Sequence, residues 1–317
     1  MADHINGSLT QSRPLVRSNN SRMILVQIFV ALFLGINTTL LAVLFLKEIH
    51  YTTMRYILFA VTLISDSVIL LFSNILLIYS YYDINIQIWS CILFCVLLSI
   101  YSFVTPVNLT AMTLERYVAI CMPLRHATLC TLRSTVNAIL IIHCLSSIPS
   151  LVILSLLFAS TSLSFYRRYS ICSFNMLIIH RWQGHLRSAI SQFYFLVMLV
   201  TIVFSYVKIM RVAKAASGED RKSSLRGLRT VALHGFQLLL CLIQLWCPFI
   251  EMAVLQIDFR LFIDVRFFNY ILFMLVPRCL SPLIYGLRDE KFCQSLKHCI
   301  LGGFHRKQRF QISHVRK

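Results

Sequence analysis

The sequence predicts an all-α membrane protein, a seven-transmembrane helical bundle with a short amphipathic cytoplasmic helix after the last span. Composition is the first reason, because 58% of residues are hydrophobic and only 13% are charged, against roughly 45–50% and about 25% in soluble proteins. Pattern is the second, because seven apolar stretches each reach the length of about 20 residues that crosses a bilayer as a helix. This composition excludes a soluble enzyme, a disordered chain and a nucleic-acid-binding domain.

The apolar stretches follow one another with short connections, so we expect a single bundle. A helix keeps its backbone hydrogen bonds within the segment, which suits a long apolar run in lipid. We expect an extracellular N-terminal tail at 1–22, a seven-span domain at 23–287, and a cytoplasmic amphipathic helix with a basic tail at 288–317. The predicted spans are 24–46, 56–80, 92–114, 136–159, 191–212, 231–256 and 267–287.

The distribution of Lys and Arg predicts the orientation, because cytoplasmic loops are enriched in both residues. With the N-terminus outside, 20 of the 30 Lys and Arg lie on the cytoplasmic side and 9 lie outside. The net charge of +18 then belongs to inner loops that meet anionic membrane lipid, and we expect no nucleic acid as a partner. We expect a multi-pass plasma membrane protein with a cytoplasmic C-terminus and with glycosylation of the extracellular sequons at Asn6 and Asn19.

Three of the 11 cysteines lie near the predicted outer face. Cys91 is at the top of the third span, Cys95 lies one helical turn deeper, and Cys172 lies in the loop between the fourth and fifth spans. A disulfide would pin this loop over the mouth of the bundle, in a compartment that permits disulfides. We favour Cys91 as the partner of Cys172, with Cys95 as the rival partner.

Motifs of catalysis are missing from the sequence, which has no HExxH, GxSxG, P-loop or CxxC and whose ten His are scattered. We therefore expect no enzymatic activity, no cofactor and no metal. Ionisable residues inside spans are the functional candidates, because burying a charge in hydrocarbon is costly. Asp66 is the first of them. It is either neutral and held by Ser65 or Ser67 or, as we favour, charged and within reach of Asn37.

Three motifs lie in the predicted spans. "ERYVAIC" ends the third span, "WCP" kinks the sixth because proline interrupts a helix, and "SPLIY" lies near the inner end of the seventh. With the seven spans, these motifs resemble the rhodopsin-like (class A) G-protein-coupled receptors over nearly the whole chain. The stretches "RYVAICMPLRHA", "LRTVALHG" and "SPLIYGLRDEKF", with Ser205-Tyr206 closing the fifth span, resemble odorant receptors of the fish type.

The resemblance implies a receptor that binds a small-molecule odorant from outside and activates a heterotrimeric G protein in sensory neurons. The expected G protein is the stimulatory olfactory type, which raises cyclic AMP. A rhodopsin-like receptor for a non-odorant ligand, such as a peptide or lipid, is the alternative, because it would differ only in the pocket. A transporter is less favoured, because Asp66 and Arg278 are too few polar groups for a path across the membrane.

The resemblance also assigns a polar core and a ligand pocket. Asn37, Asp66 and Tyr285 would belong to the core that rearranges on activation, and Trp246 would form the floor of the pocket. Glu251 could receive a cation or face a hydroxyl of a neighbouring helix. The expected ligand-binding residues, each with core packing as its alternative, are Leu98, Ser99, Ser102, Tyr194, Trp246, Phe249, Ala253 and Ile271.

A switch at the inner face is implied in the same way. Glu115 and Arg116, with Tyr206 and Tyr285, would couple the bundle to the G protein, and Cys91–Cys172 would be the family's disulfide. The basic loop at 208–229 is the expected G-protein contact, with a tether to anionic lipid as its alternative. Residues 288–300 are expected to form the amphipathic helix in the membrane interface, because their apolar residues repeat at helical spacing.

Three positions depart from the family pattern. Glu115 replaces the commoner Asp, and Ser281, also in the expected polar core, stands where the family usually has Asn or Asp. Arg278 lies one turn before Pro282, deep in the membrane and level with Asp66. We hypothesise that Arg278 ion-pairs with Asp66 and replaces the sodium ion that the family often holds there. The alternative is an Arg278 side chain that extends to the interface.

Overall fold

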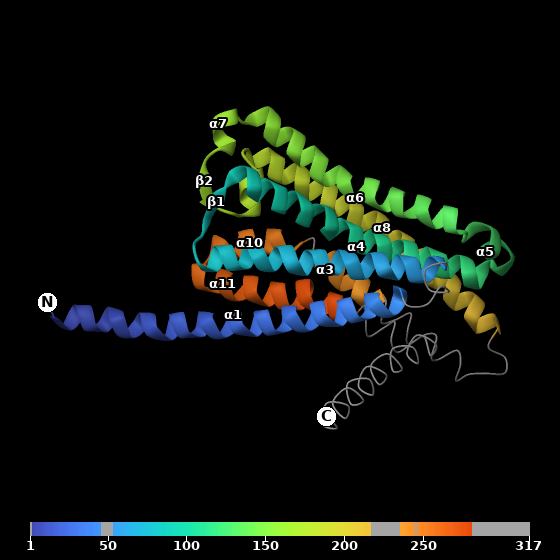
Figure 1. The fold of residues 1–317 in the computed structure, drawn as a ribbon, viewed down its shortest axis with the longest axis horizontal. Helices are drawn as coiled ribbons and strands as arrows, with labels where there is room; N and C mark the ends of the chain where they lie inside the picture. Colours follow the sequence, from blue (N-terminus) through green and yellow to red (C-terminus); the bar gives the residue numbers. More distant parts are fainter. Residues whose placement is uncertain (1, 46–52, 217–234, 245, 281–317) are drawn as a thin grey trace, which may run out of the picture.

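The computed structural model describes residues 2–45, 53–216, 235–244 and 246–280, with side chains from Asn20 onward except at 127, 175, 213–216 and 248. Long helices lie side by side, and the two short strands lie with α7 at one end (Figure 1). The helices are α1 (Ala2–Phe45), α3 (Met54–Tyr81), α4 (Ile88–Cys121), α5 (Pro123–Leu129), α6 (Leu132–Ser160), α7 (Leu163–Tyr166), α8 (Arg181–Ala216), Gly235–Gln244, α10 (Cys247–Leu255) and α11 (Phe259–Asn269). The shorter elements are strands β1 (Asn85–Gln87) and β2 (Tyr169–Ile171), the 3₁₀ helix η1 (Phe174–Leu177) and the π-helix η2 (Tyr270–Leu275).

Five of the described helices are long and apolar enough to cross a membrane: α3, α4, α6, Asn20–Phe45 within α1 and Arg181–Val212 within α8. The sixth span is the pair Gly235–Gln244 and Phe249–Leu255, whose axes differ by 46°. The seventh consists of α11 and η2, followed by helix as far as Leu280. These elements agree with the predicted all-α bundle. The end of the last span at 281–287 and the predicted helix at 288–300 lie outside the described residues.

Helix α4 lies at the centre of the described bundle, in contact with α3, α6 and α8 (Figure 1). Its residues Leu109 and Met112 pack in one buried cluster with Leu58, Phe59 and Leu63 of α3. Apolar residues also cover the outside of the spans, of which only 22–44% is buried. Lipid is as apolar as these side chains, so hydrophobicity alone does not orient the helices, and polar contacts contribute to the specificity of packing.

Amide and hydroxyl side chains provide such contacts. Asn108 of α4 donates to the carbonyl oxygen of Leu58 and to Thr62 Oγ1 of α3, both at 2.8 Å. Gln27 of α1 and Asn74 of α3 exchange two hydrogen bonds of 2.6 and 2.9 Å. These bonds satisfy polar groups that lipid cannot, and they help to fix the rotation of each helix about its axis.

One end of the bundle, here called the strand end, carries β1, β2 and α7 and lies at the left in Figure 1. The two strands are antiparallel, with Asn85 opposite Ile171 and Gln87 opposite Tyr169. They join the α3–α4 connection to the loop between α6 and α8. The opposite end is called the α5 end.

Two helices differ from the sequence expectation. Helix α1 begins at Ala2, so residues 2–22, expected as a tail, extend the first helix past the strand end (Figure 1). The seventh span contains the π-helix η2, which the apolar pattern did not predict. The break before α10 was expected, because a proline interrupts a helix.

Candidate functional site

A buried ion pair lies inside the bundle, where the sequence predicts the polar core. Arg278 Nε is 3.8 Å from Asp66 Oδ1, and the two side chains are 1% and 0% exposed. Charges this deep in hydrocarbon are tolerated when they are paired. The predicted contact is therefore formed, and Arg278 does not extend to the interface. Its guanidinium neutralises the carboxylate that would hold sodium in related receptors, so these residues do not fit a sodium ion.

Arg278 makes its hydrogen bonds with other residues. Its Nη1 and Nη2 donate to Gln244 Oε1 at 3.3 and 3.2 Å, and Nη1 also donates to the carbonyl oxygen of Met274. Asp66 Oδ1 accepts a hydrogen bond of 3.2 Å from Thr105 Oγ1 of α4. These four side chains, Thr105, Asp66, Arg278 and Gln244, are called the Arg278 network. The network joins α3, α4 and the sixth and seventh spans.

Asn37 was expected within reach of Asp66, but it bonds Ser67, the residue that follows Asp66. Asn37 Nδ2 donates to Ser67 Oγ at 3.3 Å, and Ser67 donates to the carbonyl oxygen of Leu63 at 2.7 Å. Successive helix residues point about 100° apart, so Ser67 faces α1 while Asp66 faces the Arg278 network. The other expected members of the core, Ser281 and Tyr285, lie outside the described residues.

The expected switch residues lie at the α5 end of α4. The Glu115 carboxylate is 3.3 Å from His126 Nε2 of α5, and Arg116 is 6% exposed. The resemblance implies that Glu115 can pair with Arg116. In the described part of the chain, the Glu115 carboxylate contacts the His126 ring. Burial raises the pKa of the nearby Cys130 thiol, and the negative charge of Glu115 raises it further. Cys130 therefore remains protonated at neutral pH.

Tyr206 of α8 lies against the start of the sixth span. A Cβ added at Gly235 would be 3.3 Å from Tyr206 Cε2, which is tighter than most such contacts. Glycine therefore lets the tyrosine ring approach the backbone closely. The contact joins the fifth and sixth spans on the side of the bundle where Glu115 and Arg116 lie.

Two of the expected ligand-binding residues contact α6. Ser150 Oγ donates to Ser99 Oγ at 2.9 Å, and the Tyr194 hydroxyl donates to the carbonyl oxygen of Leu145 at 2.6 Å. The Tyr194 ring also lies edge-on to Phe103, with 5.2 Å between ring centroids. In this structure Ser99 and Tyr194 contribute to helix packing, which was the alternative for each of the expected residues.

The other expected ligand-binding residues lie on the expected helices. Trp246 is 42% exposed and lies edge-on to Phe195 of α8, with 6.1 Å between ring centroids. Glu251 Oε1 accepts a hydrogen bond of 3.3 Å from Asn269 Nδ2 of α11, so this carboxylate faces a neighbouring helix. The remaining candidates are Leu98 and Ser102 on α4, Phe249 and Ala253 on α10, and Ile271 in η2.

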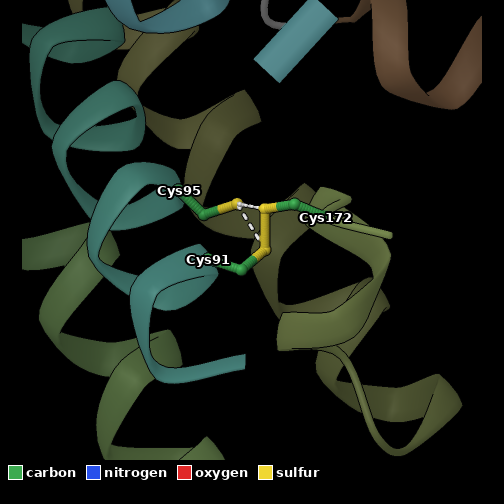
Figure 2. Close-up of side chains that lie close together, drawn as sticks. All are labelled: Cys91, Cys95 and Cys172. Carbon is green, nitrogen blue, oxygen red and sulfur yellow. Dashed lines mark hydrogen bonds between the residues drawn. A yellow bond between two sulfur atoms is a disulfide. The ribbon is translucent and has the colours of Figure 1, made fainter. Parts of the chain in front are cut away.

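Cys91 and Cys172 form the favoured disulfide, which ties the start of α4 to the loop after β2 (Figure 2). The Cys95 sulfur is 3.9 Å from Cys91 Sγ and 4.0 Å from Cys172 Sγ. Because these distances are almost equal, Cys95 lies beside the disulfide and not in line with it. Thiol–disulfide exchange needs in-line attack by a thiolate, so this arrangement does not favour exchange in the folded protein.

A cavity of about 380 Å³ lies at the strand end, away from the expected ligand-binding residues. Trp89 at its wall lies edge-on to Tyr166, with 6.3 Å between ring centroids. Aromatic side chains at the ends of spans are typical of the membrane interface, which explains this cluster. The cavity is lined by Gln87, Trp89, Phe158, Leu163, Tyr166 and Arg167.

Sequence reasoning missed three residues of the site, Gln244, Thr105 and His126. A search for ionisable residues within spans finds Asp66 and Arg278 but passes over the uncharged Gln244 and Thr105. His126 lies outside the predicted spans, among scattered histidines. One signal in the sequence could have found Gln244. A buried guanidinium has five N–H donors, which is more than a single carboxylate can accept, so Arg278 needs further polar partners.

Comparison with known proteins identifies the class. Residues 36–285 match the family described as 7 transmembrane receptor (rhodopsin family), and the chain belongs to this family. Odorant receptor 131-2 of Danio rerio is 42% identical over 280 residues, which cover 88% of this chain and 86% of that protein. Olfactory receptor 51I2 of Homo sapiens is 29% identical over 231 residues, which cover 67% and 68%. Within the rhodopsin family the chain is an odorant receptor of the fish type, as the motifs predicted, and its family consists of signalling receptors and not of enzymes.

Proposed function

We propose that the protein binds a small organic odorant in the half of the bundle near the strand end and activates a heterotrimeric G protein at the α5 end. The observation that carries the proposal is the buried Asp66–Arg278 pair, with its 3.8 Å contact between spans. A charged contact inside the bundle gives the helices a small number of preferred arrangements. A ligand that binds one arrangement better than another shifts their populations, and that shift is the signal.

The odorant-binding region would lie around Trp246, between the third, fifth, sixth and seventh spans. Trp246 is partly exposed and carries the aromatic surface that small organic ligands bind. Leu98 stands where receptors for simple amines carry an Asp, so a simple amine is disfavoured as the ligand. Of the expected ligand-binding residues, we retain Leu98, Ser102, Trp246, Phe249, Ala253 and Ile271 as direct contacts.

The strand end would face the outside of the cell. The Cys91–Cys172 disulfide supports this orientation, because such bonds persist in oxidising compartments. The N-terminus, with sequons at Asn6 and Asn19, would then be extracellular, and the basic segments near the α5 end would meet anionic lipid and the G protein. Epitope tags at the two termini test the orientation in intact cells. Only the N-terminal tag should bind antibody before permeabilisation.

The G protein would be the stimulatory olfactory type, with Glu115, Arg116, Tyr206 and Tyr285 at the coupling surface. The test is a screen of amino acids, amines, bile acids and nucleotides on cells that express the chain, with cyclic AMP as the readout. An active ligand should lose its effect in Arg116→Ala and keep it in Arg260→Ala, which changes an exposed arginine of α11. A response that survives in Arg116→Ala at equal surface level would exclude the proposed coupling.

A further inference from the structure

Gln244 occupies a special position in the sixth span. It is the last residue of helix Gly235–Gln244, immediately before the break that leads to α10. Its Oε1 accepts the two hydrogen bonds from Arg278, and its Nε2 lies 3.1 Å from Met274 Sδ. Both sides of the amide therefore contact the seventh span, next to the point where the sixth span is interrupted.

Besides the carbonyl oxygen of Met274, Arg278 has two side-chain acceptors within reach, Gln244 and Asp66, and it lies closer to Gln244. Its bonds to Gln244 are 3.2 and 3.3 Å, whereas its contact with Asp66 is 3.8 Å, which exceeds a hydrogen bond. Arg278 Nε is buried and has no hydrogen-bond partner among the described residues. Closing on Asp66 would give it a charge-assisted hydrogen bond. The bonds to Gln244 are already long, so movement of the guanidinium towards α3 would break them.

The break in the sixth span allows such an exchange. The pieces on its two sides differ in direction by 46°, so they do not behave as one continuous helix. The break is therefore the position at which the angle between Gly235–Gln244 and α10 can change. Within the described residues, its polar contacts with the seventh span are those of Gln244 and the hydrogen bond of 3.2 Å from Gln237 Nε2 to the carbonyl oxygen of Pro277.

We propose that Gln244 is a positioning residue that sets the resting state of the receptor by holding Arg278 away from Asp66. Movement of Gly235–Gln244 releases Arg278, which then closes on Asp66 and leaves the sixth span free at the α5 end. The inference deepens the proposed function, because it names the contact that regulates signalling. In the two states of the receptor, the Arg278 guanidinium has a different acceptor, Gln244 in one and Asp66 in the other.

Two substitutions at Gln244 test the sign of this effect. Gln244→Leu removes the acceptor and should raise ligand-independent GTPγS binding by the G protein severalfold. Gln244→Glu supplies a charged acceptor that competes better with Asp66, so it should lower basal activity and reduce ligand potency by about tenfold. A residue that only stabilised the fold would change activity in the same direction in both variants.

Gln192→Leu is the matched control. Gln192 is exposed on α8, and its side chain donates to Ser188 of the same helix. The control makes the same chemical change on the lipid-facing side of the bundle, and its basal activity should equal that of the unmodified receptor at the same surface level.

Labelling of Cys241 gives a second readout that needs neither ligand nor G protein. Cys241 is a free cysteine of the same helical piece and is 3% exposed. A thiol reagent applied to membranes should label it severalfold faster in Gln244→Leu and more slowly in Gln244→Glu. The same variants with Cys241→Ser give the background from other cysteines.

The results separate this proposal from the proposed function. If the unmodified receptor activates no G protein, the labelling of Cys241 alone decides the role of Gln244. If Gln244→Leu does not reach the membrane, the decrease in labelling in Gln244→Glu decides it. Equal labelling in the unmodified receptor and the variants that reach the membrane, or a shift in the same direction in both variants, overturns the proposal.

Discussion

The strand end and the interior of the bundle are held together by different kinds of bond. At the strand end, the Cys91–Cys172 disulfide and the β1–β2 pair tie the loop before α8 to the start of α4. In the interior, the Arg278 network joins four spans through one ion pair and three hydrogen bonds between side chains. The first connection is covalent, and the second consists of contacts that can change partners.

This difference fits the work of a receptor. A covalent tie keeps the loop in place while ligands enter and leave. A change of state inside the bundle needs contacts that break at a cost the ligand can supply, and coupling free energies between sites are typically about 1–3 kcal/mol. Hydrogen bonds to charged groups have the right size for this, since each contributes about 1.5–3 kcal/mol.

The largest expected effect comes from breaking the interior contact. Arg278→Leu leaves the Asp66 carboxylate buried without its cation, which should cost about 3–5 kcal/mol. Thermal unfolding in detergent and surface expression should both fall sharply. The double variant Arg278→Leu with Asp66→Asn removes both charges and should recover most of the loss. Exchanging the charges, with Asp66→Arg and Arg278→Asp together, should also recover more than either single change, and a failure of both pairs to recover would show that the ion pair is not the cause.

The next effect tests the covalent tie. Cys172→Ser removes the disulfide and should cost about 2–5 kcal/mol, seen as a lower unfolding temperature and less receptor at the surface. Cys91→Ser should cost less, because the Cys95 sulfur is 4.0 Å from Cys172 and can pair with it during folding.

Mass spectrometry of the Cys91→Ser receptor should find the Cys95–Cys172 peptide. Adding Cys95→Ser to Cys91→Ser should reproduce the full defect of Cys172→Ser. If Cys91→Ser is already as damaged as Cys172→Ser, Cys95 is not a substitute partner.

A smaller effect is expected at Thr105, which donates to Asp66 at 3.2 Å. Thr105→Val keeps the shape but removes this donor from a buried carboxylate, so the free energy of unfolding should fall by about 1–3 kcal/mol. Thr110→Val is the control, because the Thr110 hydroxyl bonds the carbonyl oxygen of Pro106 in its own helix. Equal losses in the two variants would show that Thr105 is not specific to the network.

The smallest effect concerns the contact between Glu115 and His126. The His126 side chain is 37% exposed, so solvent screens its contact with Glu115. His126→Ala should change the free energy of unfolding by less than about 1 kcal/mol, because polar contacts that are partly exposed to solvent contribute little. Thermal unfolding measures this change, and a loss as large as that of Thr105→Val would place this contact with the interior network.

The sequence predicted the helices well because a bilayer imposes a length and an apolar composition that one stretch of sequence displays by itself. It also predicted the contact of Asp66 with Arg278, because two opposite charges deep in hydrocarbon have few other ways to be satisfied. Both predictions succeed because the free-energy cost of placing polar or charged groups in hydrocarbon is large.

Finer contacts were not predictable in the same way. Gln244 is uncharged, so its presence in a span is not costly enough to mark it as special. Ser99 and Tyr194 were expected to line a ligand pocket, but an error of one position rotates a side chain on a helix by about 100°, and both residues bond α6 instead. Strands of three residues are too short to show a pattern.

The π-helix η2 links the two halves of the seventh span. Before it, Asn269 bonds Glu251 of α10, and within its first turn the Tyr270 hydroxyl is 3.3 Å from Ser73 Oγ of α3. After it comes Arg278. A π turn holds about one residue more than an α turn, so it resets the angular register of everything that follows. Deleting one residue of η2 would turn Arg278 by about 100° and point its charge away from Asp66. Whether the Arg278 charge points into the bundle interior thus depends on a local irregularity of the backbone. An alignment of side-chain types alone would not reveal this irregularity.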